Sequence, residues 1–251
     1  MFKRIIAPAL MVISPLSWAE TTSSLSVGFN YSTGKYGGTT STDIWEVPVT
    51  GRIATDDLFF KLTVPYIEVT SRGTTIVPGM GPVKTKTTTQ TTTQAGLGDI
   101  TASAGYIFYE TDRFLLDIAG NIKFGTASAE KNLGTGENDY SAQLDGYYTA
   151  GKNTLFATAG YTIVGAPAGI SVRNTAYGTL GISRKTGETS SAGLMLDAAQ
   201  STSELRQGTK ELYLFISNKI SPTLRIQANI FKGFSDSSPD FGGGTTITGT
   251  F

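Results

Sequence analysis

The sequence predicts an all-β protein, specifically a transmembrane antiparallel up-and-down β-barrel of about twelve strands. Apolar residues recur at every second position in segment after segment, which is the period of a strand whose two faces meet different environments. The connections between these segments alternate between short turns and long polar loops, as in membrane barrels. Beyond the N-terminal region, no apolar stretch is long enough to span a bilayer as a helix.

The N-terminal region has the order of features that a secretory signal peptide shows. Two basic residues, Lys3 and Arg4, precede an apolar stretch, and small residues follow up to Ala19. A single membrane anchor helix is the alternative, but two prolines interrupt a run that is already shorter than the roughly 20 residues required. We therefore expect residues 1–19 to be a signal peptide and residues 20–251 to form the barrel.

Twelve segments carry the alternation. In the first, Leu25, Val27 and Phe29 lie on one face, and polar or small residues lie on the other. The alternation is less regular in 174–184 and 209–219, where apolar residues occupy both faces. Most segments are near the length of about 9 to 11 residues that a tilted strand needs to cross a bilayer. The expected strands are 25–31, 45–53, 58–66, 99–108, 114–124, 139–148, 155–163, 174–184, 194–197, 209–219, 224–230 and 241–251.

The connections differ in length according to the side of the barrel that they serve. Short turns are expected at 54–57, 109–113, 150–153, 185–189 and 218–223, and longer loops at 33–41, 71–95, 126–138, 165–173, 201–209 and 233–240. In outer-membrane barrels the short turns are periplasmic and the long loops are external. An even number of strands then places both ends of the mature chain in the periplasm.

The last strand ends on an aromatic residue. In "TTITGTF", Ile247, Gly249 and Phe251 share a face, so this face meets lipid and Phe251 lies in the interfacial aromatic girdle. A terminal phenylalanine in such a strand also resembles the signal that the barrel-assembly machinery reads. We expect an outer-membrane protein of a Gram-negative bacterium, surrounded by outer-membrane lipids and lipopolysaccharide. A secreted β-sandwich, the alternative, does not need aromatic residues at the ends of its outer faces.

One segment differs from the other loops in composition. The stretch "TTIVPGMGPVKTKTTTQTTTQ" is rich in threonine and low in complexity, so it lacks the apolar residues that would order it. We expect a flexible, Thr-rich external loop at 72–94. A lid or a surface-interaction site is one interpretation of this loop, and a plainly disordered connection is the other.

The composition excludes several kinds of enzyme. The chain contains no histidine and no cysteine, which removes serine–histidine hydrolases, cysteine nucleophiles and the usual zinc sites. Ser128 and Lys131 have the spacing of a serine–lysine dyad, but they lie in a hydrophilic loop rather than on a helix. Asp139 and Asp145 are about 20 Å apart along a strand, too far for an acid–base pair. We expect no catalytic residue, metal or cofactor, and the charge balance does not indicate nucleic-acid binding.

Ionisable residues of both signs occupy the face that alternates with the apolar one. They either line a water-filled path or pair across the barrel and close it. Acidic residues, Glu211 among them, outnumber basic ones, so an open path would be mildly cation-preferring. The candidate lumen-lining residues are Glu46, Arg52, Lys61, Asp99, Asp117, Lys123, Asp139, Asp145, Asp197 and Arg225.

Apolar and small residues are also expected on the inner face. Tyr147, Phe156 and Phe231 offer inward apolar surface on which the ring of a solute could rest. Glycines on the same face, at Gly105, Gly160 and Gly193, are expected to leave open space beside them. A neutral aromatic solute would then be a suitable passenger.

Four motifs extend over about Ala95 to Phe251: "GLGDITASAGYIF", "NIKFGTASAEKNLGTGENDYSAQLDGYY", "GYTIVGAP" and "KGFSDSSPDFGGGTTITGTF". With them the chain resembles the outer-membrane family named for the meta-cleavage pathway of phenol degradation. The resemblance implies a barrel that takes up aromatic or other apolar small molecules, and it supplies no catalytic residue. The residues themselves leave two functions open, a channel or transporter for small molecules and a closed structural or surface-interaction barrel without transport.

Overall fold

The computed structural model describes residues 21–72, 76–77, 81–82, 91–203 and 206–251. Twelve long strands form one closed barrel. They are β1 (Thr22–Gly34), β2 (Thr42–Ala54), β3 (Leu58–Arg72), β7 (Thr101–Glu110), β8 (Phe114–Lys123), β9 (Asp139–Ala150), β10 (Asn153–Ile163), β11 (Thr175–Lys185), β12 (Ser190–Ala199), β13 (Thr209–Ser221), β14 (Leu224–Gly233) and β15 (Phe241–Thr250). Among the described residues, no helix is long and apolar enough to cross a membrane.

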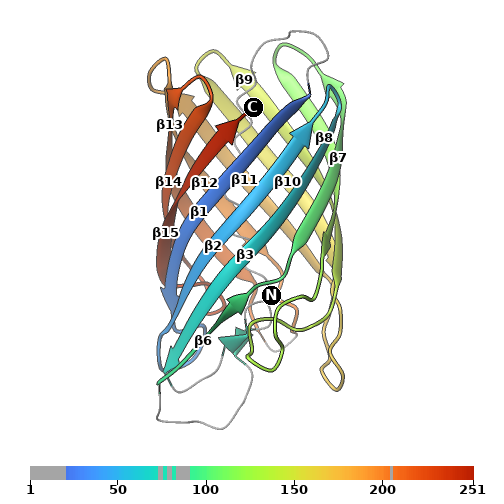
Figure 1. Cartoon of the computed structure of the whole chain (residues 1–251), viewed down its shortest axis with the longest axis vertical. Helices are drawn as coiled ribbons and strands as arrows, with labels where there is room; N and C mark the ends of the chain where they lie inside the picture. Colours follow the sequence, from blue (N-terminus) through green and yellow to red (C-terminus); the bar gives the residue numbers. More distant parts are fainter. Residues whose placement is uncertain (1–20, 73–75, 78–80, 83–90, 204–205) are drawn as a thin grey trace.

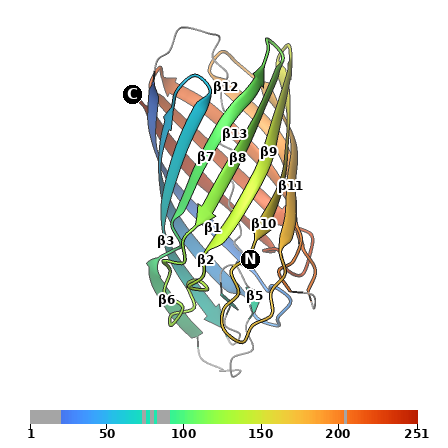
Figure 2. The ribbon, with the colours of Figure 1, turned by 90° about the vertical axis from the view of Figure 1, so that its right-hand side faces the viewer.

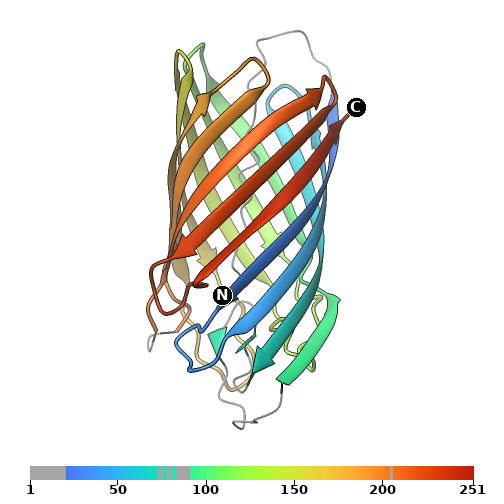
Figure 3. The same cartoon turned by 90° about the vertical axis from the view of Figure 1, so that its left-hand side faces the viewer.

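Each long strand pairs antiparallel with the next one along the chain (Figures 1 and 2). The barrel closes where the last strand meets the first, because β15 pairs with β1 through partners such as Val27 and Ile247 (Figure 3). Closure gives the backbone groups of the end strands hydrogen-bonding partners, which a membrane-spanning sheet requires. The predicted up-and-down barrel of twelve strands is confirmed.

The two ends of the barrel differ in their connections (Figure 1). Residues 55–57, 111–113, 151–152, 186–189 and 222–223 make short turns at the end where β1 begins and β15 finishes, which we call the turn end. The longer connections lie at the opposite end, the loop end, and span 35–41, 73–100, 124–138, 164–174, 200–208 and 234–240. Both sets occur where the sequence predicts them. The predicted signal peptide, residues 1–19, lies outside the described residues.

The outer face of the barrel is apolar on almost every strand. Large side chains such as Phe29, Ile216 and Ile230 are more than half exposed, and they alternate with buried or half-buried neighbours. Exposed aromatic residues lie at the loop end (Trp45, Tyr66, Tyr140, Tyr161 and Phe241) and at the turn end (Phe60, Phe108, Phe114 and Phe251). A continuous apolar band between two aromatic girdles suits lipid and is unfavourable in water. The barrel is therefore an outer-membrane protein of a Gram-negative bacterium.

The connection between β3 and β7 contains additional strand structure. Leu58–Thr63 of β3 pairs with β7, but Tyr66–Arg72 pairs with β6 (Thr91–Leu97), which folds back along β3. A small pair, β4 (Ile76–Val77) with β5 (Gly81–Pro82), completes the described part of this connection. The expected Thr-rich loop, 72–94, was too long at both ends, because Arg72 belongs to β3 and residues 91–94 belong to β6. Threonine is β-branched and favours strands, so it extends the sheet here. Residues 73–75, 78–80 and 83–90 of that loop lie outside the described residues.

Candidate functional site in the barrel lumen

A buried ion-pair network lies at the loop end, on the inner side of β8 and β9. Lys123 Nζ lies 3.3 Å from a carboxylate oxygen of Asp99 and 3.0 Å from one of Asp139. Asp99 lies in the short segment between β6 and β7, and its Oδ1 accepts the backbone N–H of Ala127 at 2.7 Å. Lys123 and Asp99 are buried and Asp139 is half-buried. This Asp99–Lys123–Asp139 network ties the β8–β9 loop, residues 124–138, to the barrel wall.

The same loop packs an apolar side chain against the inner wall. Leu133 is 0% exposed and forms a cluster with Ala127, Ile67 and Val69. Ile67 and Val69 lie on β3, and Ile44 of β2 packs against the cluster from its edge. The loop therefore turns into the mouth of the barrel instead of extending away from it. The sequence analysis missed this packing, although a leucine isolated in a polar loop was the available signal.

Loops from the other side of the barrel also cover the mouth. Tyr36, in the 35–41 loop, is buried, and its backbone carbonyl accepts a hydrogen bond from Arg206 Nη1 at 3.2 Å. Burial raises the pKa of the Tyr36 phenol well above its usual value, so the group stays neutral at physiological pH. Ser238 is buried in the 234–240 loop, where its hydroxyl accepts the N–H of Lys210 at 2.9 Å. Polar contacts thus fix several loops at this end.

Two like-charge pairs lie on neighbouring parts of the inner wall. Arg52 of β2 is the direct cross-strand partner of Lys61 on β3, and Asp117 of β8 is the direct partner of Asp145 on β9. Like charges directly opposite each other destabilise a sheet, so each pair requires other partners. Arg52 lies close enough to Asp117 to act on its charge, and Asp145 accepts hydrogen bonds from Gln143 and Thr158.

Two further candidate lumen-lining residues have individual partners. Glu46, on β2, accepts a hydrogen bond from the side-chain amide of Asn30 at 3.3 Å. Arg225, on β14, donates to the hydroxyl of Ser217 at 2.9 Å. Both residues are half-buried and alternate with more exposed outward neighbours. The structure thus places the ten candidates in separate groups along the wall rather than in one site.

A second pair of acids, and a third like-charge pair, lies nearer the loop end. Asp197 on β12 is the direct partner of Glu211 on β13. Thr179 donates to Asp197 at 2.8 Å, and the hydroxyl of Tyr213 donates to Glu211 Oε2 at 2.7 Å. Glu211 is only 4% exposed, and its Oε1 has no hydrogen-bond partner among the described residues.

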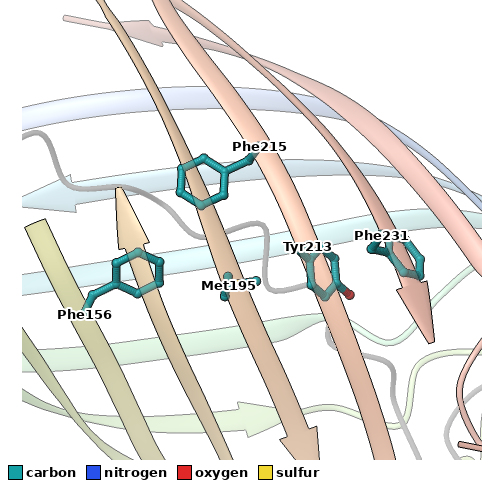
Figure 4. Close-up of a cluster of buried hydrophobic side chains, with 5 residues drawn as sticks. All are labelled: Phe156, Met195, Tyr213, Phe215 and Phe231. Atoms are coloured by element: carbon teal, nitrogen blue, oxygen red, sulfur yellow. The ribbon is translucent and has the colours of Figure 1, made fainter. Parts of the chain in front are cut away.

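An aromatic and sulfur-containing cluster covers the inner wall from β10 to β14 (Figure 4). Its members are Phe156, Met195, Tyr213, Phe215 and Phe231, all buried, with Tyr147 packed against them. The rings of Tyr213 and Phe231 stack with centroids 4.7 Å apart, and those of Phe156 and Phe215 are 6.4 Å apart. We call this set the aromatic wall.

The sequence analysis identified half of the aromatic wall. Tyr147, Phe156 and Phe231 were expected on the inner face, and the structure brings them together. Met195, Tyr213 and Phe215 were missed. Tyr213 and Phe215 belong to a strand with apolar residues on both faces, so alternation alone does not assign its inner face.

The expected open space beside inner-face glycines is wrong. Gly105, Gly160 and Gly193 are directly paired with Phe59, Tyr177 and Phe215, and a β-carbon at each glycine would collide with the paired ring. Gly181 with Phe156, and Gly242 with Phe231, repeat the arrangement. Each glycine accommodates a ring that lies across the neighbouring strand, so the ring fills the space. Five such ring–glycine pairs occur in the described part of the chain.

The groups that could support catalysis or hold a metal are not assembled. Lys131 Nζ donates to the carbonyl of Ala95 at 3.4 Å, while Ser128 Oγ accepts the backbone N–H of Lys131, so the two side chains do not form a dyad. In the described residues, no three histidine, cysteine, aspartate or glutamate side chains are grouped so as to hold a metal ion. The described inner face of the barrel carries charged and aromatic side chains instead.

Comparison with solved structures identifies the same fold. An outer membrane channel from Pseudomonas putida F1 superposes with a TM-score of 0.71 and 12% identity, over 95% of this chain and 100% of that one. NanC porin matches with a TM-score of 0.58 and 8% identity, over 90% of this chain and 98% of that one. KdgM porin matches with a TM-score of 0.56 and 10% identity, over 90% of this chain and 99% of that one. No protein-family model and no curated protein matches the sequence. At these identities the likeness establishes the fold alone.

Proposed function

We propose that the barrel is an outer-membrane channel for small aromatic or apolar molecules. The observation that carries this proposal is the aromatic wall on the inner face of a closed barrel. Phe156, Phe215 and Phe231 lie on the inner face rather than toward lipid, so aromatic side chains line this part of the inner wall. Aromatic faces attract other rings by area burial and by stacking, and each pair contributes about 0.5–1.5 kcal/mol beyond the burial itself.

The known structures with this fold are consistent with the proposal. The three structures compared above are an outer membrane channel and two porins. The motifs between Ala95 and Phe251 resemble the family linked to phenol degradation, which favours aromatic growth substrates as the solutes. The barrel-assembly machinery is the proposed partner in biogenesis, and the solute is the proposed partner in function.

A closed barrel without transport is the second candidate, and one observation favours it. The Asp99–Lys123–Asp139 network and the buried Leu133 hold the 124–138 loop inside the mouth. A loop fixed in this way narrows the entrance. Such a barrel would serve as a surface-interaction module or a structural element.

Flux measurements separate the two candidates. Purified protein in liposomes should increase the uptake of a neutral aromatic such as phenol relative to empty liposomes, and in planar bilayers it should give discrete, salt-dependent conductance steps. The variant Phe156→Ala should change the rate of aromatic uptake, because it removes a ring from the aromatic wall. Leu155→Ala is the matched control, since Leu155 is the adjacent residue and faces lipid.

Cells provide the second test. A strain that lacks the protein should take up a phenolic solute more slowly than the complemented strain at low external concentration, where the outer membrane limits supply. Equal uptake by both strains, together with persistent electrical silence of the purified protein, would leave the closed barrel as the better account.

A further inference from the structure

Three exposed lysines lie at the loop end of neighbouring strands. Lys210 is the second residue of β13 and Lys232 is the last but one of β14, and the residues on either side of each are buried or half-buried. Lys35 directly follows β1 and is exposed between two buried residues. Strands β13, β14, β15 and β1 lie side by side across the pairing that closes the barrel (Figure 1). The alternation of the two faces therefore places all three lysines on the outer side of the loop end.

Two phenylalanines that are more than half exposed lie among these lysines. Lys232 is the direct cross-strand partner of Phe241 on β15, and its Nζ lies 6.0 Å from the centre of the Phe234 ring. The backbone N–H of Phe234 donates to the carbonyl of Lys210 at 2.8 Å, which joins this residue to β13. Phe241 also pairs with Thr33, two residues before the third lysine. We call this continuous surface the basic patch, and its members are Lys35, Lys210, Lys232, Phe234 and Phe241.

Positive charge exceeds negative charge on this part of the rim, as far as the described residues extend. Asp236 and Asp240 lie in the 234–240 loop, but neither forms an ion pair with a lysine of the patch. Asp240 acts instead on the buried phenol of Tyr36. On β2 and β3, by contrast, the carboxylate of Asp43 lies 3.8 Å from the guanidinium group of Arg72, so opposite charges occur together there. The basic patch therefore favours a negatively charged partner.

The lipid around the loop end has the complementary charge. In outer-membrane barrels the long loops are external, so this end lies in the outer leaflet, which contains lipopolysaccharide. The lipid A part of lipopolysaccharide carries phosphate groups next to its acyl chains. A lysine ammonium group binds phosphate while its alkyl stem packs along apolar surface, and aromatic rings at the same level contact the acyl chains. The two residue types of the patch thus match the two parts of this lipid.

We propose that the basic patch is a binding site for the lipid A phosphates of a lipopolysaccharide molecule. The three ammonium groups contact the phosphates, and the two rings contact the adjoining acyl chains. The outer faces of β13, β14 and β15 continue the apolar surface for these chains, with exposed side chains at Leu214, Ile230 and Ile247. This surface lies outside the lumen, so the inference goes beyond the proposed channel function and does not depend on the solute.

Native mass spectrometry of the purified full-length barrel in detergent measures the binding. The three probes are lipid A with both phosphates, lipid A from which the phosphates have been removed, and phosphatidylglycerol. The wild-type barrel should bind phosphorylated lipid A most tightly. The triple variant Lys35→Gln, Lys210→Gln and Lys232→Gln should bind it roughly 100-fold more weakly, because each lysine near an anionic lipid surface contributes about fivefold. Its binding of dephosphorylated lipid A should be unchanged.

A second triple variant is the matched control. Lys152→Gln, Arg184→Gln and Lys185→Gln remove the same charge from exposed residues at the turn end and should leave the binding of all three probes unaffected. Resistance to unfolding in cold detergent checks that each variant is folded. If the loop-end triple variant fails to fold, Lys232→Gln alone should weaken the binding of phosphorylated lipid A about fivefold.

Three outcomes would contradict the proposal. Equal affinity of the wild-type barrel for phosphorylated and dephosphorylated lipid A would overturn the site, as would full retention of binding by the folded loop-end variants. Equal affinity for phosphatidylglycerol would mean that the patch binds anionic lipids in general and would refute the assignment to lipopolysaccharide. Because binding is measured without flux, none of these outcomes bears on whether the barrel transports phenol.

Discussion

Asp117 and Asp145 face each other in direct register on β8 and β9, on the inner wall of the barrel. Both are buried, and Asp145 also accepts hydrogen bonds from Gln143 and Thr158. Arg52 acts on the charge of Asp117. Arg52 itself lies directly opposite Lys61, so basic side chains, like acidic ones, are paired with each other on this wall. The inner wall as a whole carries more acidic than basic residues.

This excess should make any ion path through the barrel mildly cation-selective, because fixed charges in a pore set its ionic preference. The reversal potential of the reconstituted protein in a potassium chloride gradient measures this preference. Asp117→Asn should shift the reversal potential toward zero. A wild-type channel that prefers chloride would contradict the assignment of these acids to the conducting path.

Lys123→Met should destabilise the barrel by about 3–5 kcal/mol, because it leaves the carboxylates of Asp99 and Asp139 without their buried cation. The free energy of unfolding by urea in lipid vesicles measures this loss. The exposed pair Arg72–Asp43 is the control, since Arg72 is 62% exposed on its side chain and such pairs contribute about 0–1 kcal/mol. If Lys123→Met and Arg72→Met cost the same, the buried network does not hold the 124–138 loop.

Gly193→Ala should cost about 1–3 kcal/mol of stability, because the added methyl group would collide with the ring of Phe215 on one neighbouring strand and with the backbone carbonyl oxygen of Ile182 on the other. Gly120→Ala is the matched control: Gly120 is exposed on the outer face, and a β-carbon there meets no atom within 4 Å. Urea unfolding of the two variants provides the comparison. A Gly193→Ala barrel as stable as Gly120→Ala would mean that both the ring and the neighbouring backbone adjust without cost.

The loop end should face the cell exterior and the turn end the periplasm. An epitope inserted after Gly169, in the exposed 164–174 loop, should bind antibody on intact cells. The same epitope inserted after Gly151, in the turn between β9 and β10, should become accessible only after the outer membrane is permeabilised. The reverse pattern of labelling would invert the barrel in the membrane.

Removal of Phe251 should reduce assembly more than stability. Its backbone N–H donates to the carbonyl of Ser23 at 2.8 Å, so it extends the pairing that closes the barrel, but its side chain is 80% exposed and packs little. The amount of the truncated protein in the outer membrane should fall sharply, while the unfolding midpoint of the refolded truncated protein should change little. Normal outer-membrane levels of the truncated chain would argue against a recognition role for this residue.

The strands were predictable because lipid imposes a strict pattern on them. Most outward positions are apolar, so the alternation from Leu25 to Ile247 remains visible without knowledge of the fold. The strands with apolar residues on both faces, such as β13, were located but not oriented. Because of this ambiguity, the sequence alone did not assign Tyr213 and Phe215 to the inner face.

The internal contacts were not predictable because they depend on register and on loop conformation. The pairing of Asp117 with Asp145 requires the residue-by-residue alignment of β8 and β9, which a loop of uncertain length does not specify. The insertion of Leu133 into the mouth depends on a single side chain without periodicity. Gly105, Gly160 and Gly193 were interpreted one strand at a time. In the structure, a ring from a neighbouring strand fills the space beside each of them.

The ring–glycine pairs have a consequence for how this sequence can change over evolutionary time. Because Phe156 occupies the space above Gly181, a larger residue at 181 is tolerated only if the ring at 156 is lost or reduced at the same time. The same condition joins 193 to 215 and 242 to 231. The two positions of each pair are distant along the chain but adjacent in the sheet, so a change at one is expected to be accompanied by a change at the other. Divergence among related barrels should therefore replace both members of a pair together, and the aromatic lining should vary in whole pairs of residues.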